Sequence, residues 1–126
     1  MKKIIKTDKA PAPIGPYNQA VLSGNTLYTS GQIAINPKTG KVISASISEE
    51  TKLVMENLKE VLAAAEMTFE NVIKTSIFIS DMNHFGEINT VYGEYFNEES
   101  APARETVEVA NLPKFVNVEI SAIAVK

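Results

Sequence analysis

Residues 48–66 read SEETKLVMENLKEVLAAAE, and this stretch indicates the fold class more clearly than any other part of the chain. Its apolar residues follow the period of an amphipathic helix, at Val54, Leu58, Val61, Leu62 and Ala65. A serine hydroxyl can accept hydrogen bonds from the free amides of a first turn, so Ser46 or Ser48 is the expected cap. We therefore predict a helix here that packs one face on a hydrophobic core.

Strands are expected on both sides of this helix. Before it, residues 19–22 and 26–30 are β-favouring segments around Ser23-Gly24-Asn25, which predicts a hairpin. After it, a second helix is expected to follow Asp81 or Asn83, with strands at residues 72–80, 104–110 and 116–125. The order β-β-β-α-β-α-β-β predicts an α+β fold in which a mixed sheet carries two helices on one face.

The composition predicts a single globular domain spanning residues 1–126, because 44% of the residues are hydrophobic and 21% are charged. The net charge is −3, and no basic stripe is present that would bind nucleic acid or an anionic membrane. There is no cysteine, and His84 is the single histidine, so we expect no thiolate nucleophile and no metal site. The N-terminus lacks a signal-peptide core and no apolar run reaches the length of a membrane span, which predicts a soluble cytoplasmic protein.

The sheet is expected to be apolar on both faces. Residues 72–79 carry Ile73, Ile77 and Ile79 at one parity and Val72 and Phe78 at the other. A sheet covered by helices on one face ordinarily shows polar residues on its other face. We therefore expect a second copy of the chain to cover the second face.

Arg104 is the first candidate functional residue. If the last two strands form a hairpin and their apolar side chains share the core face, their polar side chains share the other face. That register places Arg104 together with Glu119, and with Thr106, Glu108, Asn117 and Ser121. One interpretation is a solvated face with a cross-strand ion pair, worth under about 1 kcal/mol. The other is a binding site, provided that the face is walled in.

Short motifs spread along the chain match those of a known family at the expected spacings. Near the C-terminus they are Pro102-Ala103-Arg104, Val107-Glu108-Val109-Ala110, Leu112-Pro113-Lys114 and Val118-Glu119-Ile120. Earlier ones are Ile14-Gly15-Pro16-Tyr17, Thr29-Ser30-Gly31-Gln32-Ile33, Glu56-Asn57-Leu58-Lys59 and Asn71-Val72-Ile73-Lys74-Thr75. The chain thereby resembles the Rid family, the YjgF-type reactive intermediate deaminases, and most closely its RidA group.

This resemblance implies a fold like that of the small trimeric chorismate mutases. Members form homotrimers whose sheets pack into a central barrel, with the helices outside and the active sites in clefts between subunits. The implied activity is that of a 2-iminobutanoate/2-iminopropanoate deaminase. Such an enzyme hydrolyses 2-imino acids, the tautomers of enamines such as 2-aminoacrylate, to 2-keto acids and ammonia. No cofactor or metal is implied.

The resemblance also implies roles for particular residues. Arg104 binds the substrate carboxylate through two parallel hydrogen bonds, a geometry that lysine cannot reproduce. Glu119 acts as a general base on the attacking water, and the backbone of Thr106 orients the imine nitrogen. The remaining substrate-binding residues are Tyr17, from a neighbouring subunit, and Ser30, Gly31 and Asn89.

Two positions depart from the family pattern. Glu105 stands where a small residue is usual, and strand alternation predicts that it points away from Arg104. Thr106 stands where cysteine is frequent, which changes the volume of the pocket.

Two other functions fit the same residues. One is a non-catalytic or regulatory trimer that binds small carboxylates through Arg104. The other is ribonuclease activity, which the net charge of −3 disfavours.

Overall fold

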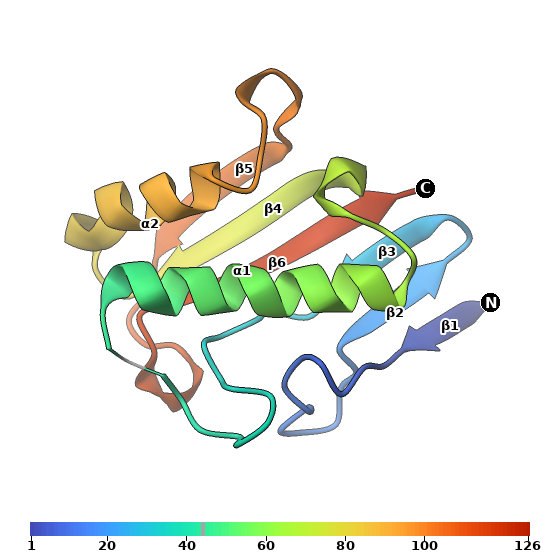
Figure 1. Cartoon of the computed structure of the whole chain (residues 1–126), viewed down its shortest axis with the longest axis horizontal. Helices are drawn as coiled ribbons and strands as arrows, with labels where there is room; N and C mark the ends of the chain where they lie inside the picture. Colours follow the sequence, from blue (N-terminus) through green and yellow to red (C-terminus); the bar gives the residue numbers. More distant parts are fainter. Residues whose placement is uncertain (44) are drawn as a thin grey trace.

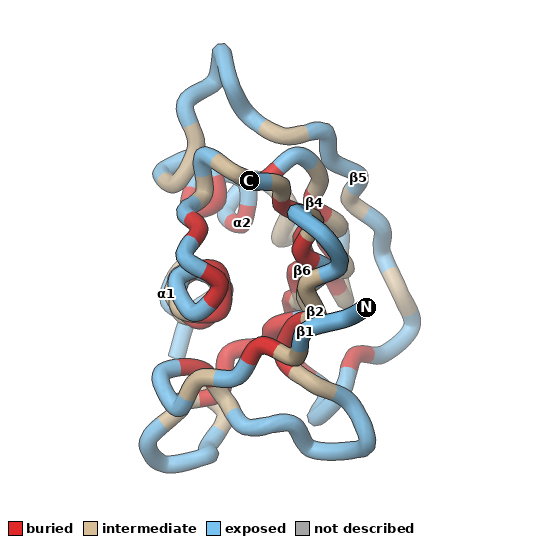
Figure 2. Tube along the Cα trace, turned by 90° about the vertical axis from the view of Figure 1, so that its right-hand side faces the viewer, coloured by how far each residue is buried: buried red, intermediate tan, exposed pale blue. Residues whose placement is uncertain are grey.

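A computed structural model of the chain describes residues 1–43 and 45–126 (Figure 1). Its single sheet contains β1 (Lys2–Ile5), β2 (Ala20–Ser23), β3 (Thr26–Thr29), β4 (Val72–Ile79), β5 (Ala103–Glu108) and β6 (Val118–Val125). Two α-helices, α1 (Ile47–Ala64) and α2 (Phe85–Gly93), lie across one face of this sheet (Figures 1 and 2). The predicted α+β fold is confirmed. None of the described helices is long and apolar enough to cross a membrane.

α1 lies where the apolar pattern predicts it, within two residues of the expected limits. The Oγ of Ser46 accepts a hydrogen bond from the backbone N–H of Glu49 at 3.1 Å, so Ser46 is the cap. The predicted stripe is fully buried at Val54, Leu58, Val61 and Leu62. The helix therefore forms one layer of the core and the sheet forms the other.

The predicted hairpin is confirmed as β2 and β3. These strands pair antiparallel, with Ser23 opposite Thr26. Gly24 in the turn has a φ of 60°, a left-handed conformation that glycine adopts without steric cost.

The last two strands do not form a hairpin, and this corrects the prediction. The strand order is β1-β2-β3-β6-β4-β5, so β4 lies between β5 and β6. β5 pairs with β4 in parallel, whereas β6 pairs antiparallel with the other side of β4. The reason is that α2 connects β4 to β5, and a helical crossover returns the chain to the end of the sheet where it started. The β-α-β order in the sequence was the available signal.

This pairing reverses the faces expected for β5. Arg104 lies opposite Thr75 in the ladder, and Thr75 is buried against α2, where its hydroxyl contacts that of Tyr92. Val107, which was expected in the core, lies opposite Phe78 and is 42% exposed on the face away from the helices. On β5, therefore, the face toward the helices carries the polar side chains of Arg104 and Thr106, and the apolar Val107 lies on the other face.

The face opposite the helices carries exposed apolar side chains, as predicted, but also the ion pair of Lys74 and Glu105. Tyr28 is 51% exposed, and Ile73 is 54% exposed because the register of β4 shifts between Val72 and Lys74. That shift separates Ile73 from Ile77 and Ile79, with which it was expected to share a face, and both of these are buried. Figure 2 shows that α1 and α2 lie together on the other side of the sheet.

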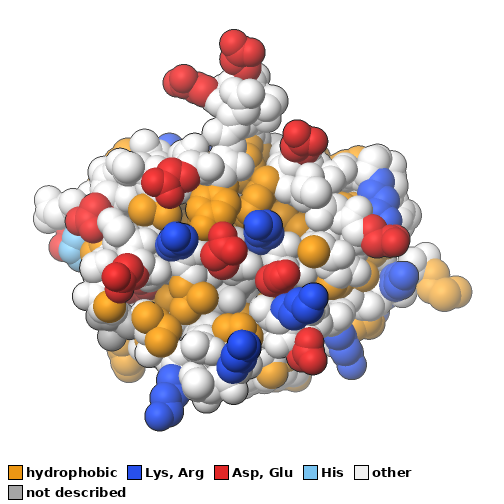
Figure 3. All heavy atoms as spheres, viewed as in Figure 1, with side chains coloured by type: hydrophobic (Ala, Val, Ile, Leu, Met, Phe, Trp, Pro, Cys, Tyr) orange, Lys and Arg blue, Asp and Glu red, His pale blue; other side chains and the backbone are white. Residues whose placement is uncertain are grey.

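Charged side chains of both signs are interspersed over the helix-bearing face (Figure 3). Hydrophobic side chains gather on it between α1 and the segment that projects between α2 and β5 (Figures 1 and 3). The aromatic rings of Tyr95 and Phe96 pack edge to face against that of Phe69, with centroids 5.4 and 5.2 Å from its centroid. This mixture of charges does not build a field of one sign on that face.

Candidate active site

The first group of predicted site residues lies on the helix side of the sheet edge. Arg104 extends from β5 beneath α2, and its Nη1 donates a hydrogen bond to Oδ1 of Asn89 at 2.6 Å. Thr106 follows on the same side of β5, and its hydroxyl is buried without a hydrogen-bond partner among the described residues. The structure thus brings Arg104 and Asn89 into contact, with Thr106 two positions further along the strand.

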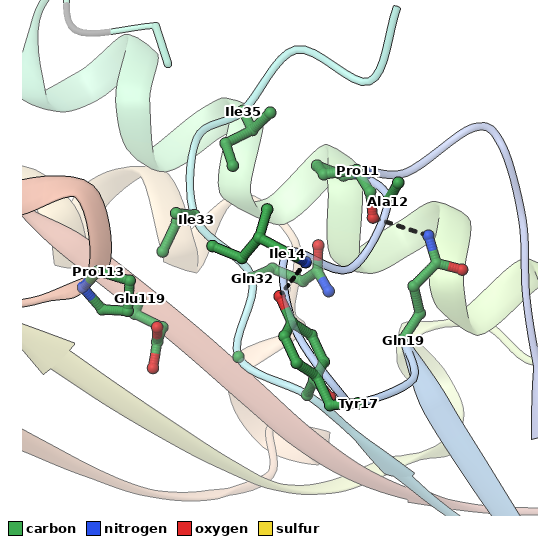
Figure 4. A pocket seen from close by; sticks show the side chains of 12 residues that line it. Pro11, Ala12, Ile14, Tyr17, Gln19, Gln32, Ile33, Ile35, Pro113 and Glu119 are labelled. Atoms are coloured by element: carbon green, nitrogen blue, oxygen red, sulfur yellow. Dashed lines mark hydrogen bonds between the residues drawn. The ribbon is translucent and has the colours of Figure 1, made fainter. Parts of the chain in front are cut away.

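The second group lines a cavity of about 340 Å³ between the N-terminal loop, the segment after β3 and the start of β6 (Figure 4). Four of the predicted residues lie here: Tyr17, Ser30, Gly31 and Glu119. The other walls are mostly apolar, and they include Ile14, Ile33, Ile35 and Pro113. The cavity therefore offers one carboxyl group in a largely apolar enclosure.

Glu119 and Gly31 are fitted to each other. A Cβ added to Gly31 would lie 2.6 Å from both Cδ and Oε1 of Glu119, a distance that real Cβ atoms do not reach. Only glycine therefore lets the carboxyl group lie against this stretch of backbone in its present position. Burial raises the pKa of Glu119 above the usual carboxyl value, because the charged form loses hydration there.

Two buried amides hold the walls of the cavity, and the predictions from sequence missed both. The Nε2 of Gln19 donates to the backbone oxygens of Ala10 and Pro11, which fixes the N-terminal loop (Figure 4). The Nδ2 of Asn57 on α1 donates to the backbone oxygens of Ile33 and Ile35 at 3.2 and 3.0 Å. The available signal for Asn57 was a polar residue on the apolar side of a predicted helix.

The two groups lie on opposite faces of the sheet, and this corrects the predicted shared face of Arg104 and Glu119. Arg104 is opposite Thr75 in one ladder, and Glu119 is opposite Phe78 in the other. Thr75 and Phe78 are three residues apart on β4, so their side chains point to opposite faces. The cause is again the position of β4 between the two strands. One copy of the chain therefore cannot bring both groups to one small ligand.

The prediction for Glu105 is confirmed. Its carboxylate lies 2.9 Å from Nζ of Lys74, and the hydroxyl of Ser76 donates to it. These contacts lower the pKa of Glu105, first through the hydrogen bond from Lys74 and then through that from Ser76. Since the contacts lie on the face away from the helices, Glu105 does not neutralise Arg104.

The described residues contain no group of three or more His, Cys, Asp or Glu side chains placed to hold a metal ion. What the two groups can do chemically is bind an anion at Arg104 and exchange a proton at Glu119.

Residues 7–126 match the model of the endoribonuclease L-PSP family, and the chain therefore belongs to this family, the YjgF or Rid family. It is 51% identical over 126 residues to a RutC family protein of Pyrococcus horikoshii, covering 100% of this chain and 99% of that one. It is 47% identical to the 2-iminobutanoate/2-iminopropanoate deaminase of Mus musculus, covering 100% and 93%. The crystal structure of TdcF from E. coli with bound serine superposes with a TM-score of 0.92 at 45% identity, covering 98% of each chain.

These likenesses confirm the predicted family and fold. They also establish that the family includes proteins named as imino-acid deaminases, as well as proteins that carry only a family name.

Proposed function

We propose that this protein is a hydrolytic deaminase that converts 2-imino acids into 2-keto acids and ammonia. The observation that carries the proposal is that Arg104, the single arginine of the sequence, has no carboxylate partner among the described residues. Its guanidinium takes part in neither of the ion pairs among the described residues, Lys74–Glu105 and Lys126–Glu66. A guanidinium without a carboxylate partner is suited to binding the carboxylate of a small acid. The name of the mouse relative supports an imino acid as that ligand.

The reaction needs few groups, because an iminium carbon is already electrophilic. A water molecule adds to this carbon and gives one proton to the carboxylate of Glu119. The product of this addition is a carbinolamine. Glu119 then gives this proton to the amino group. The C–N bond breaks and ammonia leaves as the hydroxyl proton returns to Glu119 and the carbonyl forms; the proton on Glu119 finally passes to ammonia, which becomes ammonium. The raised pKa of Glu119 supports this role, since a more basic carboxylate accepts the proton of water more readily.

The proposal requires two copies of the chain. One copy supplies Arg104 and Asn89 from its helix-side edge, and the other supplies Glu119, Gly31 and Tyr17 from its cavity. The exposed apolar side chains of Tyr28, Ile73 and Val107 support such an assembly, because a neighbouring copy would remove them from water. We propose that the assembly is the homotrimer that the family resemblance implies.

A coupled assay tests the activity. A serine dehydratase releases 2-aminoacrylate, and the rate of pyruvate formation is followed with and without this protein. We expect the protein to accelerate pyruvate release and Arg104→Ala to lower kcat/KM by about 100-fold, the usual consequence of losing a charge-assisted pair. Glu66→Gln is the control for a changed surface charge, because the exposed Glu66 lies in the turn after α1, outside both groups of site residues, and it should change kcat/KM less than about twofold. A wild-type protein that leaves the rate unchanged removes the proposal.

Non-catalytic ligand binding is the second candidate, because TdcF was crystallised with bound serine. A binding protein of this kind would take up pyruvate or serine in calorimetry and leave the lifetime of 2-aminoacrylate unchanged. The same preparations tested on RNA examine the endoribonuclease description of the family. The interspersed charges of the helix face disfavour RNA binding (Figure 3).

A further inference from the structure

The guanidinium of Arg104 lies against the faces of two aromatic rings of α2. Its Cζ is 5.1 Å from the ring centroid of Tyr92 and 5.6 Å from that of Phe85. Both distances are within the range in which a cation is attracted to the electron-rich face of a ring. With the hydrogen bond from Nη1 to Asn89, three side chains of one helix therefore contact the end of this arginine.

Tyr92 is itself held in place from the sheet. Its side chain is 5% exposed, and its hydroxyl lies 2.7 Å from Oγ1 of Thr75, which is fully buried. Thr75 is the residue directly opposite Arg104 in the β4–β5 ladder. The ring is thus fixed at the strand position next to the arginine that it supports. Burial raises the pKa of Tyr92, so the phenol stays neutral at physiological pH.

We propose that Tyr92, tethered by Thr75, is a positioning residue that holds the guanidinium of Arg104 in one direction for a substrate carboxylate, with Phe85 as its second support. The inference deepens the proposed function and rests on it. An unsupported arginine at a sheet edge samples many rotamers and loses that freedom when it binds a ligand. A guanidinium that the fold already holds in place loses less conformational entropy on binding, so it binds the ligand more tightly.

The chemical character of the supports is what favours this role over simple packing. The rings and the amide of Asn89 are all neutral, so they orient the guanidinium without pairing its charge. A carboxylate at the same place would orient it as well, but it would compete with the substrate. Asn89 binds only Nη1 of the guanidinium. Nε and Nη2 have no hydrogen-bond partner among the described residues. The Nε–Nη2 side of the guanidinium can therefore donate the two parallel hydrogen bonds that a carboxylate accepts.

Nuclear magnetic resonance can observe this arginine directly, since selective labelling with 15N-arginine yields one Nε signal from a chain with one arginine. We expect Tyr92→Leu to lower the order parameter of the Arg104 Nε–H bond to below about 0.6. We also expect the ring-current shift of that signal to diminish. Tyr95→Leu is the matched control, because it removes a tyrosine just past the end of α2 whose hydroxyl binds Glu56 instead. It should leave both properties of Arg104 unchanged.

Binding and kinetics provide the second measurement. Tyr92→Leu should raise the Kd for pyruvate and the KM of the coupled assay by about 3- to 30-fold, the range expected from losing a cation–π contact. The turnover number kcat should change less, because the supported group binds the carboxylate and not the reacting carbon. Tyr95→Leu should alter neither constant by more than about twofold.

A folded Tyr92→Leu protein whose Arg104 signal and pyruvate affinity match the wild type overturns the inference, and so do equal effects of Tyr95→Leu. If Tyr92→Leu does not fold, the double variant Tyr92→Phe with Thr75→Val decides, because it removes both hydroxyls and keeps the packing. An unchanged Arg104 order parameter in that variant also overturns the inference. Wild-type protein that binds pyruvate but does not accelerate deamination refutes the proposed function alone.

Discussion

Among single residues, the notable feature of the candidate site is that neither Arg104 nor Glu119 has an oppositely charged side chain in contact within the described part of the chain. Arg104 has aromatic and amide neighbours and no acidic one in contact, because Glu105 on the next position is paired with Lys74 across the sheet. Glu119 has the bare backbone of Gly31 beside it, which leaves its carboxyl group half-buried and accessible from the cavity. Neither group takes part in an ion pair among the described residues, so both can still bind a ligand.

The raised pKa of Glu119 predicts that this residue lowers stability at neutral pH. The folded-state pKa lies above the unfolded one, so the unfolded chain ionises first as the pH rises and stability falls through that window. Glu119→Gln removes the effect. Because solvent reaches the half-buried carboxyl, we expect a gain of only about 2 °C in Tm at pH 7.

Melting curves from pH 3 to pH 8 measure this difference. It should vanish at pH 3, where both states of the wild type carry a protonated carboxyl, and should grow above the ordinary glutamate pKa of about 4.3. A Tm difference that stays constant across the series would show that packing, and not ionisation, distinguishes the two side chains.

At the scale of elements, α1 is the support of the cavity as well as a layer of the core. Asn57 ties it to the segment that carries Ile33 and Ile35. Near its start, the buried Glu50 ties it to the beginning of β6. Oε2 of Glu50 accepts the backbone N–H groups of Asn117 and Val118, and Oε1 accepts Nδ2 of Asn117. Since Glu119 is the next residue, this contact fixes the strand from which the proposed base extends.

The pattern of donors around Glu50 predicts that an amide can replace its carboxylate. The two fixed backbone donors both use Oε2, so the oxygen of a glutamine can accept them. The amide of Asn117 can turn over and accept from the new NH₂ group, and Ser80 then exchanges its role from donor to acceptor. Glu50→Gln should therefore cost less than about 1 kcal/mol of unfolding free energy, whereas Glu50→Leu leaves buried donors unpaired and should cost about 3 kcal/mol.

Chemical denaturation of both variants against the wild type gives these free energies. Equal losses for Glu50→Gln and Glu50→Leu would mean that the start of β6 requires the negative charge itself. Asn117→Asp offers a check, because its carboxylate repels that of Glu50 but accepts from the NH₂ group of a glutamine. In that background Glu50→Gln should therefore raise the free energy of unfolding.

At the scale of the whole molecule, the sheet separates two half-sites. Arg104 is held on the helix side of its edge, and Glu119 lies in a cavity that belongs to the other face. Strand spacing and sheet thickness are fixed by backbone geometry, so no side-chain rearrangement within one copy can bring the groups together. The proposed function therefore uses two copies, in which the edge of one would meet the cavity of the next.

Mixing two inactive variants tests this arrangement. Arg104→Ala and Glu119→Gln should each lack deaminase activity, and refolding them together should restore it in about one quarter of the sites, because random assembly places an intact Arg104 beside an intact Glu119 that often. Each variant refolded alone is the control. Mixed assemblies that remain inactive would place both residues in a single copy or remove one of them from the reaction.

Much of the fold was predictable because its signals are local. The period of residues 48–66, the turn at Gly24 and the β-branched run at residues 72–80 each specify an element by themselves, and each is found in the structure. The site was less predictable, since the supports of Arg104 and of the cavity come from Tyr92, Gln19 and Asn57. In the sequence these residues look like ordinary members of helices and loops.

Local spacing was enough to predict both α-helices, most of the strands and the alternation of side chains along each strand, because these depend on a few neighbouring positions. The position of β4 between β5 and β6 depends on long-range pairing and became visible in the folded chain. The alternation of side chains along a strand is the same whichever strand lies beside it. Both faces of β4 carry apolar side chains, so the hydrophobic pattern does not distinguish the possible pairings. That one choice of neighbour placed Arg104 and Glu119 on opposite faces, which is why the proposed function involves a second copy.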